Sequence, residues 1–174
     1  MPRVIAVDAR KCVACKSCEL TCAVLHSQSK NLYQAVFEDP LPAKRIFVEN
    51  LDDFNLPLQC RHCEEPPCAM VCPTEALQKA STGEPVTLHQ EKCIGCGYCL
   101  MACPFGVLVQ RSSDGSIIKC DLCQGNRGER DAPGCVESCP TGALQYLSAT
   151  ALAKEKRREF MVEFKGAAVK PTSQ

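Results

Sequence analysis

Apolar residues in the first 148 positions fall in short runs between cysteines and polar turns. Runs of β-branched and aromatic residues favour strands. Three strands are predicted on this basis, at Val4 to Val7, Ile46 to Val48 and Val86 to Leu88. A hairpin is predicted between 107–109 and 117–118, because Asp114-Gly115 between two apolar runs favours a tight reversal with positive φ.

Helical turns are expected after the third cysteine of each of four cysteine groups, at Cys18 to His26, Cys68 to Val71, Cys99 to Cys103 and Val136 to Cys139. The repeated unit is therefore strand, cysteine loop, short helix and strand. The segments 72–77 and 139–144 repeat it almost literally. A longer helix is predicted from Ala149 to Phe164, before a Gly/Ala/Pro/Ser tail with Pro171. Its basic residues form either a solvated face or an arm that orders on a partner.

Cysteine dominates the composition, with sixteen of 174 residues, about 9%, a level typical of disulfide scaffolds. The chain has six Phe, three Tyr and no Trp, so its other apolar residues make a thin core for this length. Something other than side-chain packing is expected to hold it together. Lys plus Arg and Asp plus Glu number 20 each, which predicts no basic surface for nucleic acid.

The residues before Cys12 lack the basic start, apolar run and cleavage site of a secretory signal. No stretch approaches the ~20 apolar residues that span a bilayer, so no membrane span is expected. The expected location is the cytoplasm, where thiols stay reduced and disulfides are rare. The cysteines are therefore expected to serve another purpose.

The cysteines fall into four groups of four, and none is left over. The groups are Cys12, Cys15, Cys18 and Cys22; Cys60, Cys63, Cys68 and Cys72; Cys93, Cys96, Cys99 and Cys103; and Cys120, Cys123, Cys135 and Cys139. Groups one and three read C-x2-C-x2-C-x3-C, and proline follows the last cysteine of groups two to four. This run is typical of two-cluster ferredoxins, where the last cysteine ligates the neighbouring cluster.

A zinc-binding structural or interaction module is the alternative interpretation. Tetrahedral zinc sites of four cysteines usually consist of two CxxC pairs separated by a longer loop. Group four alone could be such a site, but groups one and three place three cysteines at i, i+3 and i+6, which suits an iron–sulfur cube better. The spacing therefore favours [4Fe–4S] clusters, with all sixteen cysteines as iron ligands.

The gaps between the groups bear on the domain organisation. The segment 73–92 makes groups two and three look like one compact two-cluster unit, around which groups one and four close as a second unit. Pairing group one with group two, and group three with group four, is also compatible with the lengths of the gaps. The nested arrangement predicts an α+β fold of two bacterial-ferredoxin-like halves: an outer half (1–50 plus 105–148), an inner half (51–104) and a C-terminal helix and tail (149–174).

Several segments resemble one protein family: residues 61–68 (RHCEEPPC), 96–99 (CGYC), 119–123 (KCDLC) and the closing CPTGAL. They are similar to the four-cluster, ferredoxin-like electron-transfer subunits of dimethyl sulfoxide reductase and formate dehydrogenase type. The match runs from about residue 3 to 147. The opening KCVACKSCEL resembles the small soluble branch that serves carbon monoxide dehydrogenases and tungsten enzymes of the aldehyde oxidoreductase type.

The resemblance implies four [4Fe–4S] clusters and a ligand set for each. Cluster one would take Cys12, Cys15, Cys18 and Cys139; cluster two Cys22, Cys120, Cys123 and Cys135; cluster three Cys60, Cys63, Cys68 and Cys103; and cluster four Cys72, Cys93, Cys96 and Cys99. Larger family insertions, a membrane anchor and an export signal are missing, which argues against a membrane-docked respiratory role.

Other residues near the ligands have less specific interpretations. A lysine precedes the first ligand of three groups, at Lys11, Lys92 and Lys119. A cation at this place would raise the reduction potential of the nearby cluster. We favour the alternative interpretation that these are solvated lysines, because exposed charges interact weakly. His62 is expected to fix its loop through a bond to backbone. His26 and His89 are interpreted as structural or exposed. The polar loop 124–131 is either solvated or contacts a catalytic subunit.

No catalytic residues are expected in this chain. It has no Gly-rich dinucleotide loop after a strand and no nucleophile with a His base. The predicted function is an electron-transfer subunit, not an enzyme by itself, in an anaerobic oxidoreductase complex. The expected partner is a catalytic subunit: a tungsten enzyme of aldehyde oxidoreductase or benzoyl-CoA reductase type first, then carbon monoxide dehydrogenase, then formate dehydrogenase. A ferredoxin or further redox subunit would be the second partner.

Overall fold

The computed structural model of the protein describes residues 3–168, so the tail around Pro171 lies outside the described residues. The elements in chain order are β1 (Arg3–Val7), η1 (Ala9–Lys11), α1 (Ser17–Leu25), α2 (Leu32–Ala35), β2 (Ile46–Leu51), β3 (Phe54–Gln59), α3 (Pro67–Met70), β4 (Leu77–Lys79), β5 (Val86–Leu88), η2 (Gln90–Lys92), α4 (Tyr98–Ala102), β6 (Val109–Gln110), β7 (Ile117–Ile118), α5 (Gly134–Glu137), β8 (Leu144–Ser148) and α6 (Ala149–Ala168). The expected α+β class is confirmed.

The strands form four separate antiparallel pairs, β1 with β8, β2 with β3, β4 with β5, and β6 with β7. Three pairs are local hairpins, whereas β1–β8 joins the two ends of the cysteine-rich region, from Arg3 opposite Ser148 to Val7 opposite Leu144. A two-stranded pair is only marginally stable by itself. These strands therefore depend on what packs against them.

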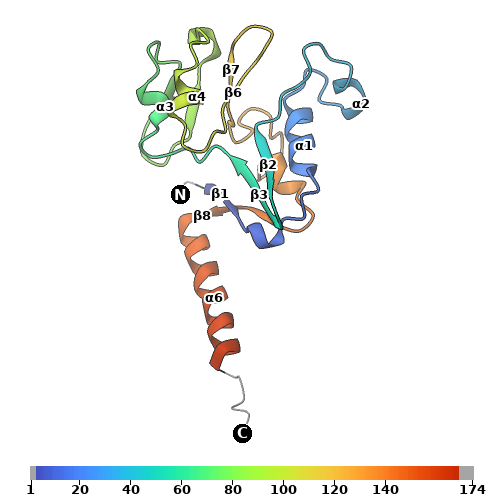
Figure 1. Ribbon diagram of the computed structural model, residues 1–174, viewed down its shortest axis with the longest axis vertical. Coiled ribbons are helices and arrows are strands. Elements are labelled where there is room, and N and C mark those ends of the chain that lie inside the picture. Colours follow the sequence, from blue (N-terminus) through green and yellow to red (C-terminus); the bar gives the residue numbers. More distant parts are fainter. Residues whose placement is uncertain (1–2, 169–174) are drawn as a thin grey trace.

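Two hydrophobic cores lie in two lobes of the molecule. The first contains α1, α5 and the strands β1, β2 and β8, and the second lies between β4, β5, α3 and α4 (Figure 1). In the first core, Gly134 of α5 sits so close to α1 that an added Cβ would collide with Leu25 Cδ1. The buried Glu19 carboxylate accepts the Val48 amide at 2.6 Å and ties α1 to β2.

The predicted elements agree with the structure in kind and place, with differences of up to four residues at their ends. Gly115 has φ of 70°, as the hairpin prediction requires. The repeated segments 72–77 and 139–144 lead into β4 and β8, which confirms the expected strand after each short helix. β3 and α2 were not predicted. Pro57 within β3 argues against a strand, but β3 pairs with β2 alone and so tolerates it.

The C-terminal helix α6 extends away from both lobes (Figure 1). Its basic residues Lys154, Lys156, Arg157 and Arg158 are exposed, as expected of a solvated face. Contacts with the body come from its first turns and from Arg10, whose guanidinium lies 3.5 Å from the carboxylates of Glu159 and Glu163. Across residues 3–168, no helix combines the length and apolar character that crossing a membrane demands.

A protein that ends at Ser148 is expected to keep the full iron content and the thermal midpoint of the intact protein. The reason is that α6 adds mainly exposed ion pairs, which contribute little to stability. Iron analysis and anaerobic thermal unfolding of the truncated and intact proteins check this. A loss of iron on truncation would contradict it and would make α6 part of the cofactor-binding body.

Candidate functional site

All sixteen cysteines are free thiols, and twelve of them lie in the two cores or pack against them. The first core contains the buried Cys18, Cys22, Cys120 and Cys135, with Cys12, Cys60 and Cys139 packed against it. The second contains Cys68 and Cys99, with Cys72, Cys93 and Cys103 packed against it. Cys15 and Cys96 are exposed, Cys63 is half-buried and Cys123 is buried. The first core thus gathers cysteines of groups one and four together with Cys60 of group two, and the second gathers cysteines of groups two and three.

One small cavity is lined by four of these thiols. Cys93, Cys96 and Cys99 of group three face it together with Cys72 of group two. The rest of its wall is mainly apolar, from Leu77, Leu88 and Ile117 among others, and also includes Thr74 and Tyr98. Thiolates in an apolar enclosure suit soft metals and iron–sulfur clusters rather than hard cations such as Mg²⁺.

A left-handed residue precedes the second cysteine in every group. These residues are Ala14 (φ 53°), His62 (φ 49°), Gly95 (φ 69°) and Leu122 (φ 55°). Such turns aim backbone N–H groups at one point and make a site for anions. The amides of His62 and Leu122 lie 3.4 and 3.5 Å from the Sγ atoms of Cys60 and Cys120, respectively. The repeated turn fits anionic, thiolate-bound clusters. Among its four left-handed residues only Gly95 is a glycine, so only that turn could have been predicted from the sequence.

The last cysteines of groups two and four have matched surroundings. Burial opposes ionisation of Cys72, but backbone donors at Leu77 and the Thr74 hydroxyl outweigh it and lower the pKa of the thiol. For Cys139, burial is likewise outweighed by the amide of Leu144 and the Thr141 hydroxyl, which lowers its pKa. Both thiols are therefore prepared for deprotonation, which metal ligation requires.

Thiols inside the first core have raised pKa values instead. Burial raises the pKa of Cys22 and of Cys120 to about 12. Burial also raises the pKa of Cys135, and the neighbouring Cys120 and Cys22 raise it further, which shows that the three sulfurs converge. Several buried thiolates are too costly to maintain without a cation. The donor set thus fits a multi-iron cluster, whose positive ions would offset that cost.

A polar network that the sequence interpretation missed borders these thiols. Nδ1 of His26 lies 2.7 Å from the Cys22 carbonyl oxygen, and Nε2 lies 3.1 Å from Asp121 Oδ1. The Arg45 guanidinium donates to the same carboxylate, which also accepts the Cys123 amide at 2.8 Å. Burial alone would raise the pKa of Asp121, but His26 and Arg45 lower it to about 2. His26 is structural, as expected, and His89 is partly exposed beside Glu91.

Replacement of Asp121 by Ala is expected to lower the free energy of unfolding of the iron-loaded protein by about 1–3 kcal/mol. It leaves the nearly buried His26 ring and the Arg45 guanidinium without their shared acceptor. Anaerobic thermal unfolding measures the effect. Asp131→Ala is the control, because Asp131 pairs with Arg3 at an exposed site and its loss should leave the midpoint nearly unchanged. Equal midpoints for the two variants would rule out a stabilising role for the network.

The lysines that precede the ligands differ from one another. Lys11 and Lys92 are exposed, as expected of solvated residues. For Lys119 that interpretation is wrong, because it is only 3% exposed and its Nζ donates to the Cys120 carbonyl oxygen at 2.7 Å. The expected role of His62 is confirmed, since its Nδ1 accepts the Val86 amide at 3.0 Å. Burial, followed by the nearby Lys119 and Lys79 cations, lowers the pKa of His62 to about 3.

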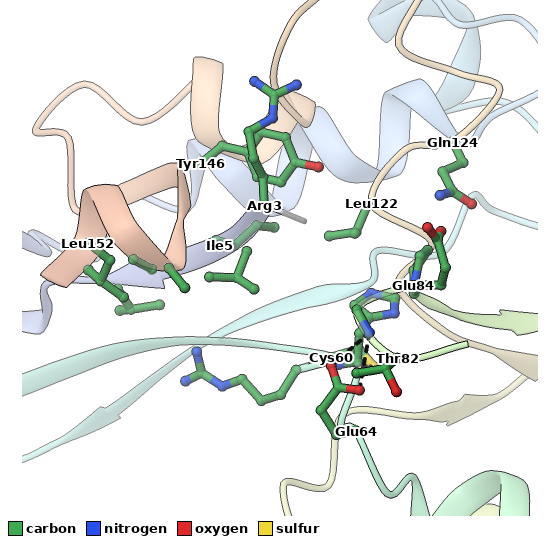
Figure 2. A pocket seen from close by; sticks show the side chains of 18 of the residues that line it. Arg3, Ile5, Cys60, Glu64, Thr82, Glu84, Leu122, Gln124, Tyr146 and Leu152 are labelled. Atoms are coloured by element: carbon green, nitrogen blue, oxygen red, sulfur yellow. Dashed lines mark hydrogen bonds between the residues drawn. The ribbon is translucent and has the colours of Figure 1, made fainter. Parts of the chain in front are cut away.

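The loop 124–131 is bound to the rest of the protein. The Arg127 side chain donates to the Leu122 carbonyl oxygen at 2.9 Å and to the Tyr146 hydroxyl at 3.1 Å. Gln124 of this loop lines a cavity of about 870 Å³ between β1, the segment 60–64, the turn 82–85 and the start of α6. Figure 2 shows Arg3 and Tyr146 on one side of it and Cys60 and Glu64 on the other.

The protein is similar in sequence to several iron–sulfur and electron transport proteins. An iron–sulfur protein of Rhodospirillum rubrum is 39% identical over 157 residues, 83% of this chain and 81% of that protein. The electron transport protein HydN of Escherichia coli is 36% identical, covering 94% of this chain and 100% of that protein. One subunit of the anaerobic dimethyl sulfoxide reductase of Escherichia coli is 35% identical, covering 80% of this chain and 70% of that subunit.

Among solved structures, a chain of the active site complex BamBC of benzoyl coenzyme A reductase is similar at a TM-score of 0.45 and 24% identity, covering 97% of both chains. The 4Fe-4S dicluster domain family matches residues 51–149, which include cysteine groups two, three and four. The protein belongs to the 4Fe-4S dicluster domain family, and its cofactors are iron–sulfur clusters.

Proposed function

We propose that the protein is an electron-transfer subunit that holds four [4Fe–4S] clusters and is not an enzyme by itself. When bound, each cluster takes up and releases one electron at a time. The observation that carries the proposal is the repeated left-handed turn, which directs amide N–H groups toward the cysteine sulfurs. Relatives named as electron transport and iron–sulfur proteins support it.

The proposed ligand sets are nested. Cluster four would be held by Cys72, Cys93, Cys96 and Cys99, which line one cavity. Cluster two would be held by Cys22, Cys120, Cys123 and Cys135; all four thiols are buried, and the charges of the first three act on the fourth, which supports the set. Clusters one and three would take Cys12, Cys15, Cys18 and Cys139, and Cys60, Cys63, Cys68 and Cys103. This arrangement corresponds to an outer half of 1–50 plus 105–148, an inner half of 51–104, and a C-terminal segment of 149–174.

The surrounding residues have defined tasks in this proposal. Apolar side chains such as Leu77 and Ile117 exclude water from the cluster ligands. Amide and hydroxyl donors, such as Thr74 and Thr141, stabilise the thiolate charge. Such partners around ligand sulfurs and the degree of solvent exposure set the reduction potential of iron–sulfur sites.

For partners, we propose a catalytic oxidoreductase subunit and a second redox protein, such as a ferredoxin. One relative is named as part of an anaerobic reductase, which supports a place in a complex. The opening motif KCVACKSCEL favours a tungsten enzyme of aldehyde oxidoreductase or benzoyl-CoA reductase type, then carbon monoxide dehydrogenase, then formate dehydrogenase. Reduced thiols are a requirement of the proposal, and the cytoplasm provides them.

Metal and acid-labile sulfide analysis of anaerobically purified protein tests the proposal. We expect about 16 irons and about 16 sulfides per chain. Zinc without sulfide would instead establish the zinc-binding interaction module. About eight irons would support two clusters and contradict four.

A further inference from the structure

Lys119 lies in the interior of the protein. Its side chain is only 3% exposed, although lysine is almost never fully buried without a partner. Within residues 3–168, its recorded polar contacts are the Cys120 carbonyl oxygen at 2.7 Å and Cys60 Sγ at 3.8 Å from Nζ. Neither partner is a carboxylate. A buried cation of this kind needs a compensating negative charge.

Matched positions in the other groups show that this burial is specific. Lys11 and Lys92 occupy the same place before a first ligand but are exposed, and Lys11 pairs with Asp8 at 3.3 Å. Gln59 holds that place in group two and is 1% exposed, but it is neutral. Lys119 is therefore the one buried cation among the four residues that precede a first ligand.

The two contacts of Lys119 belong to different clusters in the proposed ligand sets, and both lie at the first core, where Cys60 packs against the cluster that contains Cys120. Cys120 would bind cluster two in the outer half, and Cys60 would bind cluster three in the inner half. Burial raises the pKa of Cys68 to about 11 and that of Cys120 to about 12, and the Lys119 charge opposes the increase in both. The charge thus acts on thiols of both proposed sets.

We propose that Lys119 is a positioning residue that holds a positive charge beside Cys60 and Cys120, which would bind clusters three and two, and that this charge raises the reduction potentials of both clusters. This inference rests on the proposed function, because the compensating anions would be the thiolate-bound clusters. Reduction adds one electron to a cluster and makes it more negative, so a nearby cation favours the reduced form. The N–H···S contact with Cys60 directs the larger effect to cluster three. Lys119 would thereby ease passage of an electron from one half to the other.

The test is a potentiometric titration, followed by electron paramagnetic resonance, of the full-length iron-loaded protein and its Lys119→Gln variant. In the variant we expect one cluster to need a potential lower by at least ~59 mV for half-reduction, a tenfold change in the ratio of reduced to oxidised cluster for a one-electron couple. A second cluster should shift in the same direction by less. Lys92→Gln is the matched control, because it removes the exposed lysine from the equivalent position and should leave all potentials unchanged.

Lys119→Arg keeps the charge and should retain the wild-type potentials. Unchanged potentials in Lys119→Gln would overturn the inference, as would a shift of the same size in Lys92→Gln. If Lys119→Gln loses iron, the Lys119→Arg variant decides between charge and shape. Full iron content and wild-type potentials in Lys119→Arg would support a role for the positive charge. Loss of iron from Lys119→Arg would show that only the shape of the side chain matters and would overturn the inference. Iron analysis of the wild-type protein is done first, so that failure of the four-cluster proposal is distinguished from failure of this inference.

Discussion

Removal of iron and sulfide is expected to abolish the cooperative unfolding transition of the protein. The loss would be the whole free energy of unfolding, ~5–15 kcal/mol for a typical domain. The cores explain this expectation: four of the nine residues in the first buried cluster are cysteines, and its apolar members are aliphatic side chains such as Ile46 and Leu144. Four separate two-stranded sheets add little stability of their own. Metal-coupled domains behave in this way because the binding energy of the metal is folding energy.

Circular dichroism of anaerobically prepared protein, before and after chelation, measures this effect. The apo-protein should lose its ordered signal and its sigmoidal thermal transition, and reconstitution with iron and sulfide should restore both. Protein held in the same buffer without chelator is the control. An apo-protein that stays compact and melts cooperatively would show that the apolar residues alone can form the two cores.

Paired cysteine substitutions are expected to separate the nested ligand sets from sequential pairing. In the nested arrangement, Cys22→Ala with Cys135→Ala removes two ligands of one cluster, so a single cluster signal should be altered. Cys22→Ala with Cys63→Ala should alter two. The physical reason is that Cys22 and Cys135 lie in the same buried core, whereas Cys68, from the same group as Cys63, lies in the second core with Cys99 of group three.

Iron content and electron paramagnetic resonance of the reduced double variants provide the measurement. Each variant carries two substitutions of the same type, so the pair is matched for the number of thiols lost. If group one instead shared its clusters with group two, Cys22→Ala with Cys63→Ala would alter one cluster and Cys22→Ala with Cys135→Ala would alter two. That reversed result would contradict the nested sets.

Short-range features of the fold were predictable from the sequence. The four helical turns and the Asp114-Gly115 hairpin occur where the spacing and turn residues place them, because both depend on neighbours a few positions away. β3 was not predictable, since Pro57 argues against a strand and only pairing with β2 forms it. The left-handed turns had one visible signal, at Gly95. Ala14, His62 and Leu122 adopt the same backbone without a glycine.

The sequence by itself indicated the chemistry: within four groups, most neighbouring cysteines are separated by two, three or four residues, a spacing typical of iron–sulfur cluster ligands because it controls local turns. Only the tertiary structure decided which distant residues meet. β1 pairs with β8 across the cysteine-rich region, and His26 reaches Asp121, 95 positions away. It also buried Lys119 against Cys60 while leaving Lys11 and Lys92 exposed. These contacts depend on loop closure and on the packing of two lobes, and the sequence around any one cysteine group contains no information about either.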